Sequence, residues 1–469
     1  MKKIMKYLPV LFMIFALLVS SCEDELEQLP PEQLSNELSL STYANLQLAT
    51  NGIYTPLYGA NWYGRDFTVI SDLKGGNGKS SPLFSGRFQT EYNWANSEGT
   101  TANFFNNAYI LIARANNVIN AIADFEEPGV TEAQLNQLEG EALFLRALAY
   151  FDLVRMYAQP YSSDPQSLGV PVVLVTEIGE PARNTVAEVY DQIVSDLTTA
   201  ESKIGTPNRG QTDPVGLASK PAVQALFAKV YLYMENWQGA ADYATKLIEN
   251  SNFSLYTASE YPTVWGTDAA SEVIFEVFGS STQSGWPGFD EIGYIYYTDG
   301  YGDVCASDDL TGLYEAGDVR AEVFTSHPDH PGFLWPGKYP GKEQIRVNNI
   351  VVLRLAEMYL IRAEALLKGA SVSGATPVGD YNAIRTNRGL DAEGEGTVSL
   401  ENIWDERRRE LCFEGNQLWD LSRTGRGLVR TDYSGAGDAD ISFPDYKWAM
   451  PIPATEMDRN PNMEQNPGY

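Results

Sequence analysis

The chain has 469 residues, with 62 Asp and Glu against 33 Lys and Arg, and its net charge is −29. A chain this acidic is repelled by nucleic acid and by anionic membrane surfaces, so binding to either is disfavoured. Its three cysteines are too few for a small scaffold held together by disulfides.

The N-terminal segment has the pattern of a secretory signal. Three lysines precede an apolar run, residues 8–19, which is too short to span a bilayer. The run ends in Val-Ser-Ser-Cys, which resembles the lipobox of bacterial lipoproteins. This predicts that residues 1–21 are removed and that Cys22 is lipidated, with more than one acyl chain for stable attachment. An ordinary signal peptide with an incidental cysteine is the alternative.

The residues that follow predict a flexible tether. Glu23, Asp24 and Glu25 are acidic, and the stretch up to Pro31 is rich in Pro, Gln and Glu. We assign residues 22–32 to this tether. Loss of the three signal lysines leaves the mature chain at −32 (−29 − 3). The remaining length suffices for two domains, or for one large helical domain with insertions.

Apolar residues recur with the period of a helix in several segments. The clearest is 133–157, in which Leu138, Ala142 and Leu145 fall close to one stripe. The other segments with this period are 102–122, 186–201, 220–235, 237–250, 353–368, 377–388 and 399–414.

A recurring spacing suggests helical repeats. The pattern Ala-x-x-Tyr occurs in the first helix of three helix pairs, at Ala147, Ala228 and Ala356. A small residue lets the partner helix approach, and the tyrosine one turn later fills the gap beside it. The pattern resembles tetratricopeptide repeats and predicts a mostly α-helical fold.

Two regions lack the helical period. Residues 52–100 are rich in Gly, Asn, Ser and aromatic residues, and residues 254–349 are punctuated by Gly and Pro. This composition predicts long irregular loops with few short strands, of which 272–278 is the clearest. A helical scaffold with long aromatic insertions is a common way to present a binding surface.

Residues that could bind a metal ion are sparse. His327 and His330 flank Pro328 and Asp329 in a loop without helical ligand spacing, so we expect a solvated loop there. Oxygen-rich loops can hold calcium, but the aspartates of the C-terminal loop do not have the spacing of an EF-hand. These aspartates are Asp432, Asp438, Asp440 and Asp445. We expect no cofactor, with a structural calcium ion as the alternative.

The chain also lacks a catalytic signature. Gly-x-Ser-x-Gly, a phosphate loop and the dinucleotide fingerprint do not occur where a strand, turn and helix would need them. The run "DERRRE", 405–410, alternates in sign within a helix and predicts structural ion pairing. Cys412 lies in an apolar pattern and predicts a buried thiol, while a disulfide with Cys305 stays open. A pair of glycosidase carboxylates also stays open, because such a pair meets only in the fold.

Four blocks of the sequence resemble the SusD-like (RagB/SusD) family and keep that family's order. They are "EALFLRALAYFDLVRMYAQPY" (141–161), "VVLRLAEMYLIRAEALL" (351–367), "IWDERRRELCFEGNQLWDLSRTG" (403–425) and "MPIPATEMDRNPNMEQNPGY" (450–469). The resemblance implies one SusD-like domain over residues 33–469. Its helical repeat scaffold would cover about 102–250 and 351–425, and its loop-rich ligand-binding regions about 52–100 and 254–349.

The resemblance also implies a function. Members of the family are glycan-binding lipoproteins on the surface of the Gram-negative outer membrane, where they cover a SusC-like TonB-dependent transporter. The acidic run after Cys22 is similar to the family's surface-export signal. No enzymatic activity is expected. The charge of the mature chain favours a neutral oligo- or polysaccharide. Another nutrient such as peptide is the first alternative, and a glycoside hydrolase is the second.

Aromatic residues of the loop-rich regions are the expected ligand contacts. Trp and Tyr rings bury the flat C–H faces of sugars, and neighbouring polar groups bind the hydroxyls. Tyr294 and Tyr296 are expected to share one face of an extended chain. The candidate ligand-binding residues are Trp62, Tyr63, Arg65, Asp66, Tyr92, Asn93, Trp94, Trp286, Asp290, Tyr294, Tyr296 and Trp335. The tryptophans expected to be structural are Trp237, Trp265, Trp404, Trp419 and Trp448.

Overall fold

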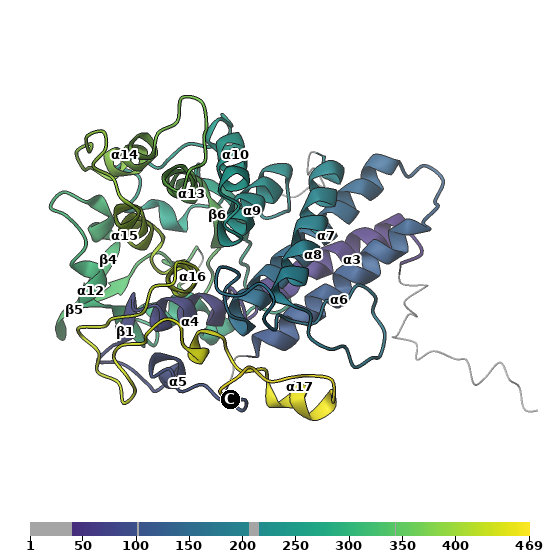
Figure 1. Ribbon diagram of the computed structural model, residues 1–469, viewed down its shortest axis with the longest axis horizontal. Coiled ribbons are helices and arrows are strands. Elements are labelled where there is room, and N and C mark those ends of the chain that lie inside the picture. The colour runs from purple at the N-terminus through teal and green to yellow at the C-terminus, as the bar shows by residue number, and fades with distance from the viewer. Residues whose placement is uncertain (1–39, 101–102, 206–214, 343) are drawn as a thin grey trace, which may run out of the picture.

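The computed structural model describes residues 40–100, 103–205, 215–342 and 344–469. The predicted signal segment, the predicted lipidation site Cys22 and the predicted tether lie outside these residues. Helices dominate the described chain, and its strands are short (Figure 1). A mostly α-helical fold is therefore confirmed.

Long helices build one end of the molecule, which lies on the right in Figure 1. They are α3 (Tyr43–Tyr54), α6 (Phe104–Ala123), α7 (Glu132–Tyr157) and α8 (Val186–Lys203). Helix α7 packs against α6 and α8, and nearly all its residues from Gln137 onward are buried. It begins at a capping box, in which Thr131 accepts a hydrogen bond from the Gln134 backbone and Gln134 accepts one from the Thr131 backbone.

Shorter helices follow in consecutive pairs. They are α9 (Lys220–Tyr233), α10 (Trp237–Ile248), α13 (Leu355–Leu367), α14 (Pro377–Asn387), α15 (Leu400–Leu411) and α16 (Gln417–Arg423). Helix α9 packs on α10, and α13 packs on α14. Ala147, Ala228 and Ala356 are all fully buried. The small residue of each predicted repeat therefore lies where helices approach one another.

The two loop-rich regions contain only short elements, and they meet in space. The first region holds η2 (Thr55–Tyr58), α4 (Asp66–Lys74), β1 (Gly78–Ser80) and α5 (Gln89–Tyr92). The second holds η3 (Val264–Gly266), β2 (Val273–Val277), η4 (Gly288–Asp290), α11 (Ile292–Tyr296), β3 (Val304–Ala306), α12 (Asp308–Thr311), η5 (Val319–Val323), β4 (Phe324–His327) and β5 (His330–Pro336). Strand β1 pairs antiparallel with β3, so the two regions share a sheet.

The remaining strands and short helices complete the body. Strand β2, close to the predicted strand 272–278, pairs antiparallel with β6 (Ile350–Arg354), and β4 pairs with β5. The C-terminal segment adds η6 (Tyr446–Trp448) and α17 (Ala454–Arg459). Helix α4 was not predicted. All nine of its residues are buried, so it has no polar face and no helical period in its sequence.

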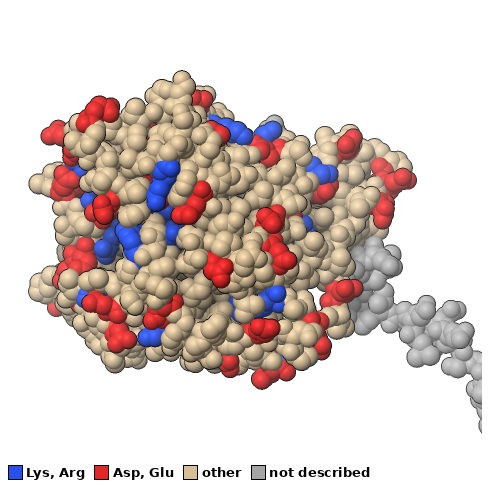
Figure 2. Space-filling view, in the orientation of Figure 1, with Lys and Arg blue, Asp and Glu red and all other residues tan. Residues whose placement is uncertain are grey.

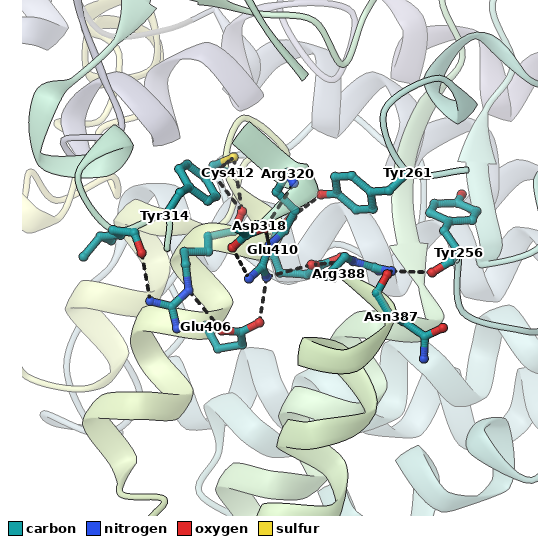
Figure 3. A network of polar contacts seen from close by, with 12 residues as sticks. Tyr256, Tyr261, Tyr314, Asp318, Arg320, Asn387, Arg388, Glu406, Glu410 and Cys412 are labelled. Carbon is teal, nitrogen blue, oxygen red and sulfur yellow. Dashed lines mark hydrogen bonds and ion pairs between the residues drawn. The ribbon is translucent and has the colours of Figure 1, made fainter. Parts of the chain in front are cut away.

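A buried network of ion pairs anchors α15 to its neighbours (Figure 3). Glu410 contacts Arg354 and Arg388 at 2.7 Å each and Arg320 at 3.0 Å. Burial would raise the pKa of Glu410, but the guanidinium groups hold that pKa well below its ordinary value. The predicted ion pairing of 405–410 is confirmed. Most of the ion-pair partners of these α15 residues come from other elements, whereas Glu406 and Arg409 pair with each other within α15.

Both described cysteines are buried free thiols, so Cys305 and Cys412 form no disulfide. The prediction of a buried thiol at Cys412 is confirmed. Its position also differs slightly from the prediction, because Cys412 caps the C-terminus of α15 instead of lying within the helix.

Candidate ligand-binding surface

Several predicted ligand contacts belong to the core. Trp62 is fully buried, and its indole Nε1 donates a hydrogen bond to Asp152 on α7 at 2.8 Å. The Tyr63 hydroxyl donates to the same carboxylate at 2.7 Å. Trp62 also packs edge-on against Phe104. Neither ring presents a face to a ligand, which contradicts the prediction for this pair.

Four further aromatic candidates are also buried, which contradicts their predicted role. These are Tyr92, Trp94, Tyr296 and Trp335, with exposed fractions of 2%, 3%, 0% and 0%. Trp94 packs edge-on against Trp448 and under the Lys74 ammonium, 4.0 Å from its ring centroid. Trp335 donates from Nε1 to the Gly302 carbonyl at 2.8 Å. Each ring fills a gap between segments that are distant in sequence.

The predicted shared face of Tyr294 and Tyr296 is also wrong. The segment forms helix α11, in which residues two positions apart point in different directions. Tyr294 therefore stays half-buried, while Tyr296 stacks on Tyr339 in the core with ring centroids 5.8 Å apart. Burial raises the pKa of Tyr296 well above its ordinary value.

Two polar candidates are held inside the first loop-rich region. Asp66 is buried, and burial raises its pKa although its carboxylate pairs with Arg65 at 2.7 Å. Asn93 is half-buried, and its side-chain oxygen accepts hydrogen bonds from the Tyr433 hydroxyl and the Ala436 amide. Asn93 thus anchors the C-terminal loop.

The remaining predicted contacts, among them Trp286 and Tyr294, lie near two aromatic residues that were not predicted, Phe289 and Tyr301. Phe289 is 57% exposed, and its ring centroid lies 5.4 Å from that of Tyr294. Tyr294 in turn lies 4.8 Å from Tyr301, edge to face. Trp286 is half-buried in the same loop. Phe289, Tyr294 and Tyr301 therefore form a continuous, partly exposed group of rings, and Trp286 lies in the same loop.

Arginines border this group. The Arg346 guanidinium lies 4.0 Å from the ring centroid of Phe289 and 5.6 Å from that of Trp286. Arg87 lies 3.6 Å from the ring centroid of Tyr301. Arg65 pairs with the exposed Asp290 at 2.9 Å. We use "aromatic surface" for Trp286, Phe289, Tyr294, Tyr301, Arg87, Arg346 and the pair Arg65–Asp290.

Buried polar contacts hold the loop that carries these rings. The Glu291 carboxyl accepts hydrogen bonds from the Gly293 amide at 2.7 Å and from the Asn348 side chain at 3.0 Å. Burial raises the pKa of Glu291 to about 8. The Ile292 amide donates to the Gly64 carbonyl at 2.8 Å, which ties the loop to the first loop-rich region. The surface thus depends on contacts between both loop-rich regions.

Sequence reasoning missed Phe289, Tyr301, Arg87 and Arg346. Three of them stand beside glycines, in "GFD", "GYG" and "SGRF", so a Gly-flanked aromatic or arginine was the available signal. Arg346 has no such signal, because its position depends on the contact of its carbonyl with the Trp286 indole at 2.8 Å.

The charge of this surface differs from that of the molecule as a whole. Acidic side chains are spread over the visible face of the molecule (Figure 2). The aromatic surface instead has three arginines, of which Arg65 pairs with Asp66 and Asp290 and Arg87 pairs with the buried Asp303. Its polar groups can therefore donate hydrogen bonds to hydroxyl and carboxylate oxygens.

The described residues offer no group of three or more His, Cys, Asp or Glu side chains placed to hold a metal ion. The ring centroids of His327 and His330 are 5.3 Å apart. Asp432 pairs with Lys79, Asp438 pairs with Lys447, and Asp445 caps η6. The aspartates of the C-terminal loop therefore have separate partners.

No helix within the described ranges has both the length and the apolar character needed to cross a bilayer.

Comparisons with known proteins identify the family. One family model, described as "Starch-binding associating with outer membrane", matches residues 26–232, and the SusD family model matches residues 336–469. The chain is 26% identical to the "SusD-like protein P2" of Formosa agariphila, over 99% of this chain and 100% of the relative.

Solved structures agree with these matches. A SusD superfamily protein from Bacteroides thetaiotaomicron is 31% identical, with a TM-score of 0.83 over 91% of this chain and 100% of its own. A "putative sugar binding protein" from Bacteroides vulgatus is 30% identical, with a TM-score of 0.84 over 92% of this chain and 99% of its own. The protein therefore belongs to the SusD family.

Proposed function

We propose that the protein captures a neutral oligo- or polysaccharide at its aromatic surface and delivers it to a SusC-like TonB-dependent transporter. The observation that supports this most directly is the group of partly exposed rings around Phe289 and Tyr294, bordered by arginines and Asp290. Stacking on sugar C–H faces needs such rings, and hydroxyl binding needs such polar neighbours.

The family supports the class of ligand and the cell compartment. Its model is described as starch-binding and associated with the outer membrane. We propose that Cys22 is lipidated and anchors the protein at the cell surface, with residues 22–32 as a tether. The tether would let the folded body cover the transporter.

Peptide and anionic glycan are the competing ligands. Arg346, which has no carboxylate partner among the described residues, would tolerate an anionic group locally, although the net charge of −29 opposes the approach of a polyanion. A neutral glycan avoids this long-range repulsion, which is why we favour it.

We further propose that binding occurs without hydrolysis. A glycosidase needs two carboxyl groups that reach the glycosidic bond. At this surface Arg65 pairs with both Asp66 and Asp290, so one guanidinium engages both carboxylates. Incubation of purified protein with starch, laminarin and xylan should release no reducing sugar, and release by the wild type that is lost in Asp290→Asn would overturn this proposal.

The binding site is tested by the double variant Trp286→Ala/Phe289→Ala. Affinity gels and calorimetry with starch, laminarin and xylan should identify a ligand of the wild-type protein. We expect the double variant to bind that ligand at least about tenfold more weakly, equivalent to about 1.4 kcal/mol. The matched control is Tyr446→Ala, which removes a 41% exposed ring outside the surface. Equal affinity of wild type and double variant would overturn the site.

A further inference from the structure

A cavity of about 200 Å³ lies among the paired helices α9, α10, α13, α15 and α16. A water molecule occupies about 30 Å³ in the liquid, so this space has room for several waters. None of its lining residues belongs to the aromatic surface. Figure 1 shows these helices grouped beside one another, away from the long helices α3 and α6.

Two indole rings line the cavity. Trp237 is the first residue of α10, Trp404 lies in α15, and both are half-buried. Trp237 also packs against the core, as expected of a structural residue. Buried polar groups normally have partners, yet the buried Nε1 of Trp404 has no hydrogen-bond partner.

Cations accompany both rings. The Lys368 ammonium lies 5.3 Å from the ring centroid of Trp237, and the Arg426 guanidinium lies 4.5 Å from that of Trp404. Within the described ranges neither cation has an ion-pair partner, in contrast to the arginines of the buried network. Of these two cations Lys368 lines the cavity, whereas Arg426 lies outside the lining and donates to the Thr424 hydroxyl at 2.8 Å.

The floor of the cavity is polar but already satisfied. Arg423 donates two hydrogen bonds to Glu364, at 2.7 and 2.8 Å, and a third to Asp420 at 2.7 Å. Leu232 and Phe443 add apolar surface. A ligand would therefore meet polar side chains that are already paired, two indoles, and the Lys368 ammonium.

We propose that this cavity is a second carbohydrate site, which holds a single sugar ring. An indole can cover the C–H face of a pyranose, and a hydroxyl or ring oxygen can accept a hydrogen bond from the Lys368 ammonium. The ligand class rests on the proposed glycan-binding function, whereas the site itself rests on residues that the aromatic surface does not use. A branch or a chain end of a bound polysaccharide has the required size.

Fluorine NMR of protein labelled with 5-fluorotryptophan tests both sites separately. Trp286 reports on the aromatic surface, and Trp237 and Trp404 report on the cavity, with each resonance assigned by a Trp→Phe variant. Free glucose, galactose, xylose and glucuronate serve as probes up to about 100 mM, because single sugar rings bind in the millimolar range.

We expect at least one sugar to shift the resonances of Trp237 and Trp404, and Lys368→Met to weaken this response at least about threefold with an unchanged melting temperature. Unshifted resonances at both cavity tryptophans with all four sugars would overturn the proposal, whatever Trp286 shows. A response to phenol but to no sugar would also overturn it, since the cavity would then be a site for apolar ligands. A response at the cavity without one at Trp286 would support the second site and contradict the aromatic surface.

Discussion

Replacing Glu291 with glutamine should increase the unfolding free energy relative to the wild type, and this difference should grow as the pH rises. Glu291 lies beneath the aromatic surface, and burial raises its pKa from the ordinary value of 4.5 to about 8. The folded state therefore favours the protonated carboxyl. Its contribution to stability is fully present below pH 4.5 and is lost as the pH rises towards 8.

The expected size follows from the same pKa difference. At about 1.4 kcal/mol per pKa unit, the difference between 4.5 and about 8 corresponds to roughly 5 kcal/mol of unfolding free energy. Glutamine does not titrate, and its side-chain oxygen can still accept the hydrogen bond from the Gly293 amide. The unfolding free energy of Glu291→Gln minus that of the wild type should therefore increase by an amount of this order between about pH 4 and pH 9.

Urea unfolding followed by circular dichroism at several pH values measures this difference. Glu322→Gln, at an exposed position of the same loop-rich region, is the control and should show little pH-dependent difference from the wild type. A free-energy difference for Glu291→Gln that stays constant from about pH 4 to pH 9 would show that the carboxyl is not protonated in the folded protein.

Three further outcomes are expected. Glu410→Gln should lower the unfolding free energy by about 3–5 kcal/mol, because it leaves three buried guanidinium groups short of their shared carboxylate. Urea unfolding should show this loss, while the exposed Glu401→Gln on the same helix should change stability by less than about 0.5 kcal/mol; similar effects of the two would contradict the network's role. Trp62→Phe should lower the melting temperature because Asp152 loses one donor, yet leave calorimetric glycan affinity unchanged, and weaker affinity would return Trp62 to the ligand site. Cys22→Ala should shift the protein from the membrane fraction to the soluble fraction, and retention in the outer membrane would contradict lipid anchoring.

The helical part of the fold was accessible to sequence reasoning. The segments 133–157 and 186–201 match α7 and α8 closely, because an amphipathic helix repeats its apolar residues every turn and often begins at a capping residue such as Thr131 or Thr185. Helix α4 escaped prediction because both its faces are buried.

The ligand surface was only partly accessible. Arg65, Trp286, Asp290 and Tyr294 were expected and do lie together, whereas Trp62 is a core residue. Composition does not separate these cases, because a tryptophan in a glycine-rich loop serves equally well as a platform or as a packing element. The position of Asp152, 90 residues away in the sequence, decides the matter for Trp62.

The sequence by itself determined the family, the helical segments and the acidic character of this protein, because these follow from local period, composition and ordered blocks of residues. Only the tertiary structure decided which aromatic rings stay exposed and which cations lack a carboxylate. Exposure and ion pairing depend on segments that meet across the fold, such as Arg65 with Asp290 or Trp286 with Arg346. No single stretch of sequence carries that information.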